Sequence, residues 1–244
     1  MKNYKYWEAR AVFKDNLLEK KIKKIKSKVS KLFKSTRKQI INELKVFYVD
    51  IKESQYIKYQ TESLLTRINY LIDNLYGNNK KEVITAFTEL YGIMDNEASK
   101  ELGVNSHAIN ESKVNEIIED NWMGLTLSER IEEHKRKLNL SMKEEILKGI
   151  KRGDSIQDIS RIIMDKFDTS YTNTMRLVRT EASRVMNEAT LNNYKENGIK
   201  EYQIMAYLDN KTSKICRDMD GEVVNAKDAI AGENMPPFHW PSKL

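Results

Sequence analysis

Hydrophobic residues recur every three or four positions near the start of the chain, and this period predicts an amphipathic helix. The clearest series is Leu18, Ile22, Ile25, Val29 and Leu32. It extends in both directions, so we expect one or two helices between about residues 8 and 52. No proline precedes residue 236 and no glycine precedes residue 77. Because these residues interrupt regular structure, their absence favours long elements and disfavours sandwiches and barrels in this region.

The helical period continues beyond residue 52. Apolar residues between Ile57 and Leu75 predict a further helix, which we expect to end at Gly77-Asn78-Asn79. A separate helical segment is predicted for residues 81–91, before Gly92. Residues 95–122 are less regular and indicate no single element.

Start and stop signals divide the next part of the chain. Capping-box patterns at Thr126 and Ser141 each precede an amphipathic run, so we expect a helix to begin at each. Two glycines, at 149 and 153, indicate a helix end followed by a new N-cap. A short helix over about residues 156–167 should then break at residues 168–170. A longer helix is predicted for residues 171–196, ending at Asn197-Gly198.

After Gly198 the period changes from helical to alternating, which predicts strands. Residues 201–208 form the first expected strand, and Val223-Val224 form the second after a tight turn at Asp220-Gly221. The predicted fold class is therefore mainly α, with elongated N-terminal helices followed by a small α+β C-terminal module. We divide the chain into a basic helical region, 1–125, and this module, 126–244.

Charge is concentrated at the N-terminus. Residues 1–52 hold 16 Lys and Arg against 5 Asp and Glu, a net +11, so the remaining residues carry −5 of the +6 on the whole chain. Clustered like charge repels itself unless a partner neutralises it, which favours a basic arm that contacts nucleic acid or an acidic protein. A solvated helix packed through its apolar stripe is the simpler interpretation, and a membrane-surface helix ranks third. The candidate nucleic-acid contacts are Lys20, Lys21, Lys23, Lys24, Lys26, Lys28, Lys31, Lys34, Arg37 and Lys38.

Other features exclude whole classes of protein. A single cysteine excludes an intrachain disulfide framework and fits a reducing compartment. The N-terminus lacks a secretory h-region, and no apolar run approaches the ~20 residues of a spanning helix. No phosphate-binding loop of the Gly-x-x-x-x-Gly-Lys type is present, which argues against a packaging motor. We therefore expect a soluble intracellular product.

The predicted helix over residues 171–196 carries the densest polar cluster. Arg176, Arg179, Thr180, Arg184 and Asn187 recur at three- and four-residue spacings, so much of the cluster shares one face. One interpretation is an exposed face with weak ion pairs. The other is a buried polar network, anchored by Arg179 and Glu181, that holds the following strands. Spacing alone leaves both interpretations open.

These residues, with others that follow in order, resemble the phage minor head protein family, the Mu-F-like head morphogenesis family. The resemblance covers about residues 145–241 and rests on four elements: Arg-Thr-Glu with a following Arg and Asn, Asp-x-Lys-Thr-x-x-x-Cys, Asp-Gly, and Pro-Pro-Phe-His. Their motif residues are Arg179, Thr180, Glu181, Arg184, Asn187, Asp209, Thr212, Cys216, Asp220, Gly221, Pro236, Pro237 and His239.

The chain departs from the family pattern at two points. Ser213 stands where the first cysteine of a Cys-x-x-Cys pair is expected, and the Cys/Arg-rich ending is absent, which implies a module truncated at Leu244. A tetrahedral zinc site needs about four Cys or His ligands, and Cys216 and His239 supply two. We therefore predict no metal and no cofactor, with Cys216 as a small buried hydrophobe.

The resemblance implies a virion protein of the phage head, present in the host cytoplasm during assembly. Its implied partners are the portal protein, head or scaffold proteins and packaged double-stranded DNA, with no membrane. The implied roles are head morphogenesis and DNA retention or ejection, without catalysis. The alternative is a metal-dependent nuclease or DNA-processing protein that uses the Asp209/Asp220/His239 region.

Overall fold

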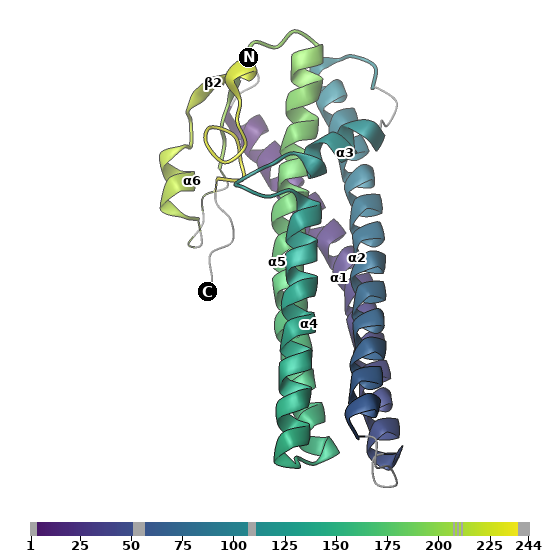
Figure 1. Cartoon of the computed structure of the whole chain (residues 1–244). Helices are drawn as coiled ribbons and strands as arrows, with labels where there is room; N and C mark the ends of the chain where they lie inside the picture. Colours follow the sequence, from purple (N-terminus) through teal and green to yellow (C-terminus); the bar gives the residue numbers. More distant parts are fainter. Residues whose placement is uncertain are drawn as a thin grey trace. The chain divides into compact units, whose positions relative to one another are not determined.

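The computed structural model describes residues 4–50, 57–106, 111–206, 208, 210 and 212–238. Within those residues the chain is mainly α-helical, with one two-stranded sheet near its C-terminal end (Figure 1). This confirms the predicted fold class. The helices are α1 (Tyr4–Asp50), α2 (Ile57–Leu102), α3 (Glu111–Glu119), α4 (Leu127–Arg152), α5 (Ile156–Glu196) and α6 (Lys214–Asp218). The strands are β1 (Glu201–Gln203) and β2 (Val223–Asn225), followed by a short 3₁₀ turn, Ala226–Asp228.

Helix α2 is unbroken, so the predicted helix end at Gly77-Asn78-Asn79 is wrong. The apolar stripe continues on both sides of the glycine, because Leu75, Val83 and Phe87 are all buried. Packing of that continuous stripe outweighs the modest helix-breaking tendency of one glycine. The new helix expected at Ser141 is also wrong, since α4 runs through it with Leu138 and Met142 both buried.

The predicted break at residues 168–170 is also wrong, because α5 passes through it. Side chains that would cap a new helix are engaged elsewhere. Asp168 pairs with Arg37 of α1 at 3.1 Å, and the Ser170 hydroxyl lies 2.6 Å from the Tyr76 hydroxyl of α2. Thr172 donates back to the Asp168 carbonyl at 2.9 Å, within the helix. Because these side chains bind distant partners, they do not compete with the helix for its backbone hydrogen bonds.

The predicted boundaries of α5 are confirmed at both ends. At its start, the Ser155 hydroxyl accepts from the Asp158 amide at 3.2 Å, as an N-cap does. At its end, Gly198 has φ +75° and donates to the Lys195 carbonyl at 3.2 Å. The Ile199 amide reaches the Tyr194 carbonyl at 2.9 Å, which completes a glycine-terminated C-cap.

Strands β1 and β2 pair antiparallel, with Tyr202 opposite Val224. The first strand is shorter than the predicted 201–208, because its backbone pairing with the segment before β2 ends at Ile204, and α6 lies in the connection between the two strands. Ile204 accepts from the Gly221 amide and donates to the Glu222 carbonyl, both at 2.8 Å. The Asp220 carboxylate then accepts from the Ala206 amide at 2.8 Å, so it binds the chain just beyond the strand.

The described chain forms two compact units, each assembled from separate segments. Unit 1 comprises residues 1–24, 84–127 and 177–244, and unit 2 comprises residues 25–83 and 128–176. The predicted division of the chain into residues 1–125 and 126–244 rests on charge and motifs in the sequence, and it stays a prediction. Among the described helices, none has the length and apolar character needed to cross a bilayer.

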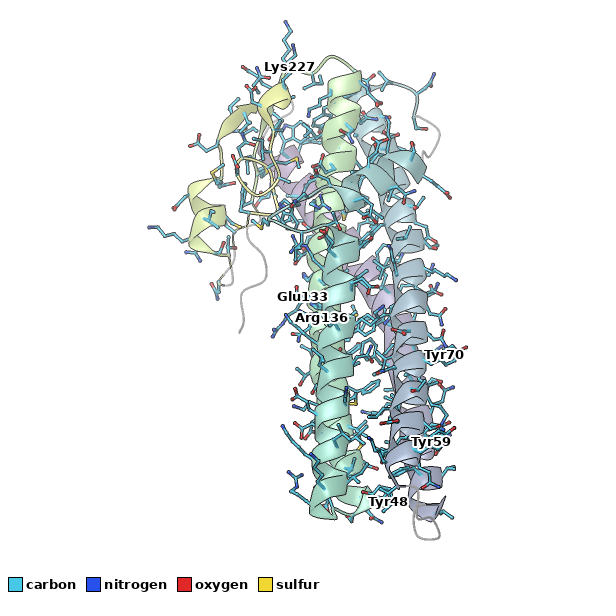
Figure 2. All side chains as sticks on the ribbon, viewed as in Figure 1. Tyr48, Tyr59, Tyr70, Glu133, Arg136 and Lys227 are labelled. Atoms are coloured by element: carbon cyan, nitrogen blue, oxygen red, sulfur yellow. The ribbon has the colours of Figure 1, made fainter. Side chains whose placement is uncertain are left out.

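Unit 2 is built around an aromatic cluster. The Phe33 ring of α1 contacts Tyr76 of α2 and both Phe167 and Tyr171 of α5, with ring centroids 5.6–6.2 Å apart in edge-to-face geometry. Tyr70, by contrast, points away from this core on the outer face of α2 (Figure 2), with 66% of its area exposed. Aromatic residues of this unit therefore divide between core and solvent.

Replacing Gly77 with alanine should stabilise unit 2. Gly77 lies inside α2, and a Cβ built on it meets no atom within 4 Å. Alanine lowers the entropy of the unfolded chain without strain, so the free energy of unfolding should rise by roughly 0.5–1 kcal/mol. Urea denaturation followed by circular dichroism measures this change, and an unchanged or lower stability would contradict the uninterrupted helix.

Candidate functional site

The motif face of α5 contains a buried ion pair. The Arg184 Nε atom donates to the Glu181 carboxylate at 2.9 Å, and each side chain is only 1% exposed. The two residues are three positions apart, which brings them together on one helix face. Of the two predicted interpretations, the buried network is the one that describes this pair.

Arg184 also connects α5 to the segment between α3 and α4. Its guanidinium lies 5.2 Å from the ring centre of Trp122 and 3.6 Å from the Asp120 carboxylate. The Trp122 indole N–H in turn donates to the Ala231 carbonyl at 3.0 Å. Gly232 follows with φ +90°, and a Cβ there would lie 3.0 Å from the indole nitrogen, so this position requires glycine.

Asn187 makes the second connection to the C-terminal loop. Its amide nitrogen donates to the Ser183 carbonyl within α5 and to the Pro236 carbonyl, at 3.0 and 3.2 Å. Pro237, joined to Pro236 by a cis peptide bond, is half-buried. Two elements of the resemblance, the Arg-Thr-Glu helix and the Pro-Pro loop, therefore meet through this one side chain.

The remaining helix residues of the motif separate into buried and exposed positions. Thr180 is 8% exposed, whereas the Arg179 side chain is 49% exposed and pairs with Glu19 of α1. Arg179 was predicted as an anchor of the buried network, and that role is wrong. On a helix, positions 179 and 181 point in different directions, and only the second faces the interior.

The later motif residues have structural partners or lie outside the described residues. Cys216 on α6 is half-buried, so its prediction as a buried hydrophobe is wrong. The Thr212 carbonyl accepts from Arg217 at 3.1 Å. Asp209 and His239 lie outside the described residues. Within the described part of the chain, no group of three or more His, Cys, Asp or Glu side chains is placed to hold a metal.

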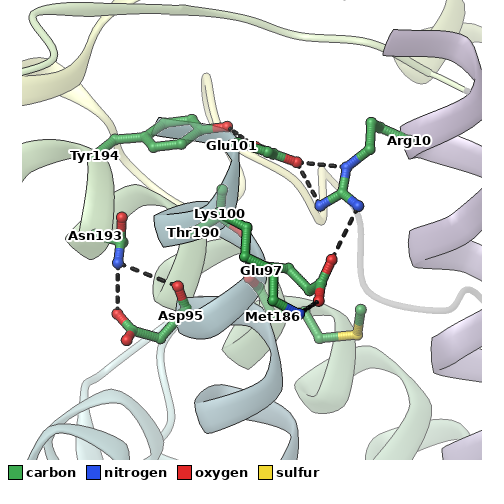
Figure 3. A network of polar contacts seen from close by, with 9 residues as sticks. All are labelled: Arg10, Asp95, Glu97, Lys100, Glu101, Met186, Thr190, Asn193 and Tyr194. Carbon is green, nitrogen blue, oxygen red and sulfur yellow. Dashed lines mark hydrogen bonds and ion pairs between the residues drawn. The ribbon is translucent and has the colours of Figure 1, made fainter. Parts of the chain in front are cut away.

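A second polar network, absent from the sequence predictions, joins α1, α2 and α5 (Figure 3). Arg10 binds Glu101 at 2.5 Å and Glu97 at 3.1 Å, and the Tyr194 hydroxyl donates to Glu101 at 2.8 Å. Nearby, the Asn193 amide donates to the Asp95 carboxylate at 2.9 Å. The contacts join residues 87 to 98 positions apart, so no local spacing could have indicated them.

Burial and charge shift the pKa values in this network so that Arg10 and Glu97 stay ionised while Tyr194 stays protonated. Burial lowers the pKa of Arg10, but Glu101 and Glu97 outweigh it and hold the pKa above its ordinary value. The hydrogen bond from Lys100, with help from Arg10, lowers the pKa of Glu97. Burial, reinforced by the Glu101 charge, raises the pKa of Tyr194, so the phenol remains a donor.

The Arg10–Tyr194 network borders a cavity of about 600 Å³ in unit 1. Helix α1 contributes Trp7, Ala11 and Lys14 to its wall, and α5 contributes Leu191 and Tyr194. The whole of β1 lines another side, together with Ile204 and Met205. Cavities of this size and mixed lining are typical of binding sites.

The predicted basic residues of α1 differ in how far they are neutralised. Eight of the ten are exposed, and Lys21 and Arg37 are half-buried. Lys21 and Lys24 approach Glu89 at 2.9 and 3.9 Å, and Lys28 binds Glu82 at 2.6 Å. The others, apart from the Arg37–Asp168 pair, make no ion pair within the described ranges: Lys20, Lys23, Lys26, Lys31, Lys34 and Lys38.

Within unit 2, three of those unpaired lysines share one face of α1. Lys31, Lys34 and Lys38 are spaced three and four residues apart, on the side of the helix opposite Val29, Phe33 and Ile40. The apolar stripe packs into the core as predicted, while these ammonium groups face solvent. The solvated-helix interpretation is thus correct for the stripe, and it does not exclude a use for the lysines.

The buried pair, its links to the C-terminal loop and the order of the motifs lead to the family comparison. Residues 141–241 match the family model described as Phage Mu protein F like protein. This confirms the predicted resemblance over the C-terminal part of the chain. The Phage Mu F-like segment, as we call residues 141–241, contains the Glu181–Arg184 pair, Asn187 and the Pro236–Pro237 loop.

One curated relative comes from Enterococcus faecalis and is named NAD(+)--arginine ADP-ribosyltransferase EFV. It is 26% identical over 136 residues, which are 54% of this chain and 28% of the relative. This chain therefore matches little more than a quarter of that protein's length. No solved structure matches the chain.

Proposed function

We propose that this protein is a bacteriophage minor head protein that acts in head morphogenesis in association with the portal. The observation that carries the proposal is the match of the Phage Mu F-like segment to its family model. The motif residues that the structure describes support it, because they hold elements together. The Glu181–Arg184 pair is buried, and Asn187 binds the C-terminal loop. These side chains therefore stabilise the fold, which suits a protein whose role is to present a folded surface to its partners in an assembly.

The same proposal places the protein in the virion, after assembly in the host cytoplasm, with the portal and head or scaffold proteins as partners. It assigns no catalytic role. The nuclease alternative receives no support: the Asp220 carboxylate accepts from a backbone amide, and the name of the enterococcal relative describes a different chemistry. That relative's activity is not carried over, because so little of its length is matched.

Co-sedimentation tests the head assignment. In lysates of the phage that encodes this chain, we expect the protein to sediment with portal-containing procapsids and to remain in purified virions. A procapsid made without portal should retain much less of it. Absence of the protein from both portal-containing procapsids and purified virions would contradict the proposal, whatever the outcome of the DNA experiment below.

We further propose that the lysine face of α1 contacts packaged double-stranded DNA without sequence preference, in DNA retention or ejection. Exposed, unpaired lysines suit phosphate contacts, which release counterions and weaken steeply as salt rises. Lys31, Lys34 and Lys38 supply three such groups on one face.

Replacing these three lysines with glutamine should reduce the salt dependence of DNA binding. The slope of log K against log salt should fall by about 0.9 for each lost phosphate contact. The matched control replaces Lys137, Lys148 and Lys166 with glutamine, which removes the same amount of charge. These three lysines pair with glutamates of α4 at 2.6–3.9 Å. Fluorescence anisotropy on a random-sequence duplex measures both. Equal slopes for the two triple variants would contradict the assignment of the lysine face.

A further inference from the structure

The cavity of unit 1 contains a cation whose charge no ion pair neutralises. Lys14 of α1 is half-buried and lines the cavity together with Ala11 of the same helix and Glu101 and Leu102 at the end of α2. Among the described residues, no carboxylate lies within ion-pair distance of its ammonium group. Glu101 is the acid whose charge Lys14 feels most, but both of its oxygens are already bound, one by Arg10 and one by Tyr194.

This arrangement leaves Lys14 as the group that a negatively charged ligand would meet. Burial lowers the pKa of Lys14, and the Arg10 charge adds to that effect, so an incoming carboxylate would relieve an unfavourable environment. Around it the wall is largely apolar, with Leu102, Leu191 and Ile204 among the lining residues. The cavity thus combines one unneutralised cation with apolar surface.

Strand β1 offers a second feature at the same cavity. The Ile204 amide donates to the Glu222 carbonyl, and the Ala226 amide donates to the Lys200 carbonyl. In an antiparallel pair the backbone N–H and C=O groups of alternate residues point toward the partner strand, so those of Tyr202 point toward β2 and those of its two neighbours in the strand point away from it. The backbone groups of Glu201 and Gln203 therefore form a free edge, since β1 pairs only with β2 in the described part of the chain. All of β1 lines the cavity, whereas β2 contributes Val223.

We propose that this cavity binds an extended peptide segment of a partner protein, with an acidic residue two positions away from a large apolar one, so that both side chains lie on the same face of the added strand. The peptide would add to the free edge of β1, where main-chain hydrogen bonds supply affinity. Its carboxylate would pair with Lys14, and its apolar side chain would pack beside Leu191 and Ile204. The site goes beyond the proposed head function, because it identifies a partner by its chemistry and does not depend on DNA or on the portal.

An array of capped hexapeptides tests the proposal. Each peptide contains leucine and, two positions later, glutamate or glutamine, and the four other positions are randomised. Labelled full-length protein should bind the best glutamate peptides about tenfold more strongly than their glutamine counterparts, the usual effect of one charge-assisted hydrogen bond. The Lys14→Gln variant should lose this preference and bind the glutamate and glutamine peptides equally.

Two further variants make the experiment specific. Lys20→Gln removes an exposed, unpaired lysine from the same helix outside the cavity, and it should keep the tenfold preference. Ala11→Trp fills the cavity and should weaken binding of both peptide sets. The proposal is overturned if wild type binds no peptide, if it binds both sets equally, or if Lys14→Gln keeps the preference. These outcomes do not bear on procapsid association, so the two proposals fail separately.

Discussion

Glu181→Ala will lower the free energy of unfolding of unit 1 by about 3–5 kcal/mol, because it leaves the Arg184 guanidinium buried without its main partner. The Arg184 side chain is 1% exposed, and its other carboxylate contact, Asp120, lies 3.6 Å away with a largely exposed side chain. Urea denaturation followed by tryptophan fluorescence measures the change. The buried Trp122 ring, which the guanidinium faces, makes this probe sensitive to unit 1.

Arg179→Ala is the matched control for this prediction. It removes a charged partner from the same helix, but the Arg179–Glu19 pair is about half exposed on both sides. Solvent-exposed pairs contribute at most about 1 kcal/mol, so this variant should remain close to wild type. A double variant, Glu181→Met with Arg184→Met, should recover most of the lost stability because it leaves no unpaired charge. If Glu181→Ala proves as mild as Arg179→Ala, the pair has no role in holding unit 1 together.

Phe33→Ala will destabilise unit 2 by about 3–5 kcal/mol, the usual cost of removing a buried aromatic ring and leaving a cavity. Phe33 is 3% exposed and contacts three other rings, from α2 and α5. The loss should appear as faster hydrogen exchange in peptides from residues 25–50. Circular dichroism during urea denaturation gives the corresponding free energy.

Tyr70→Ala serves as the control, since it removes an aromatic ring from the outer face of α2. Exposed substitutions of this kind usually change stability by less than about 0.5 kcal/mol. Equal effects of the two variants would show that the cluster around Phe33 does not form. Comparing the tryptophan signal of Phe33→Ala with that of Glu181→Ala also tests whether units 1 and 2 unfold together or separately.

Local sequence predicted those features that depend on a few neighbouring residues. The apolar stripe through Ile25 and Val29 is buried as its period indicated, and the caps at Ser155 and Gly198 are in place. The predictions failed where a local signal had a distant competitor. The residues next to Asp168 in sequence indicate that it caps a helix, but its side chain pairs with Arg37 of α1, 131 residues away in sequence.

For the candidate site, the sequence by itself determined the residues of the motif and the family they resemble, because the order and spacing of motifs can be recognised without knowledge of the fold. Only the tertiary structure decided which of them are structural anchors: Glu181 is buried against Arg184, whereas Arg179 faces solvent. It also brought Arg10, Glu101 and Tyr194 together beside a cavity. Caps and periods act over one or two helical turns, whereas contacts between residues more than 90 positions apart exist only once the helices pack.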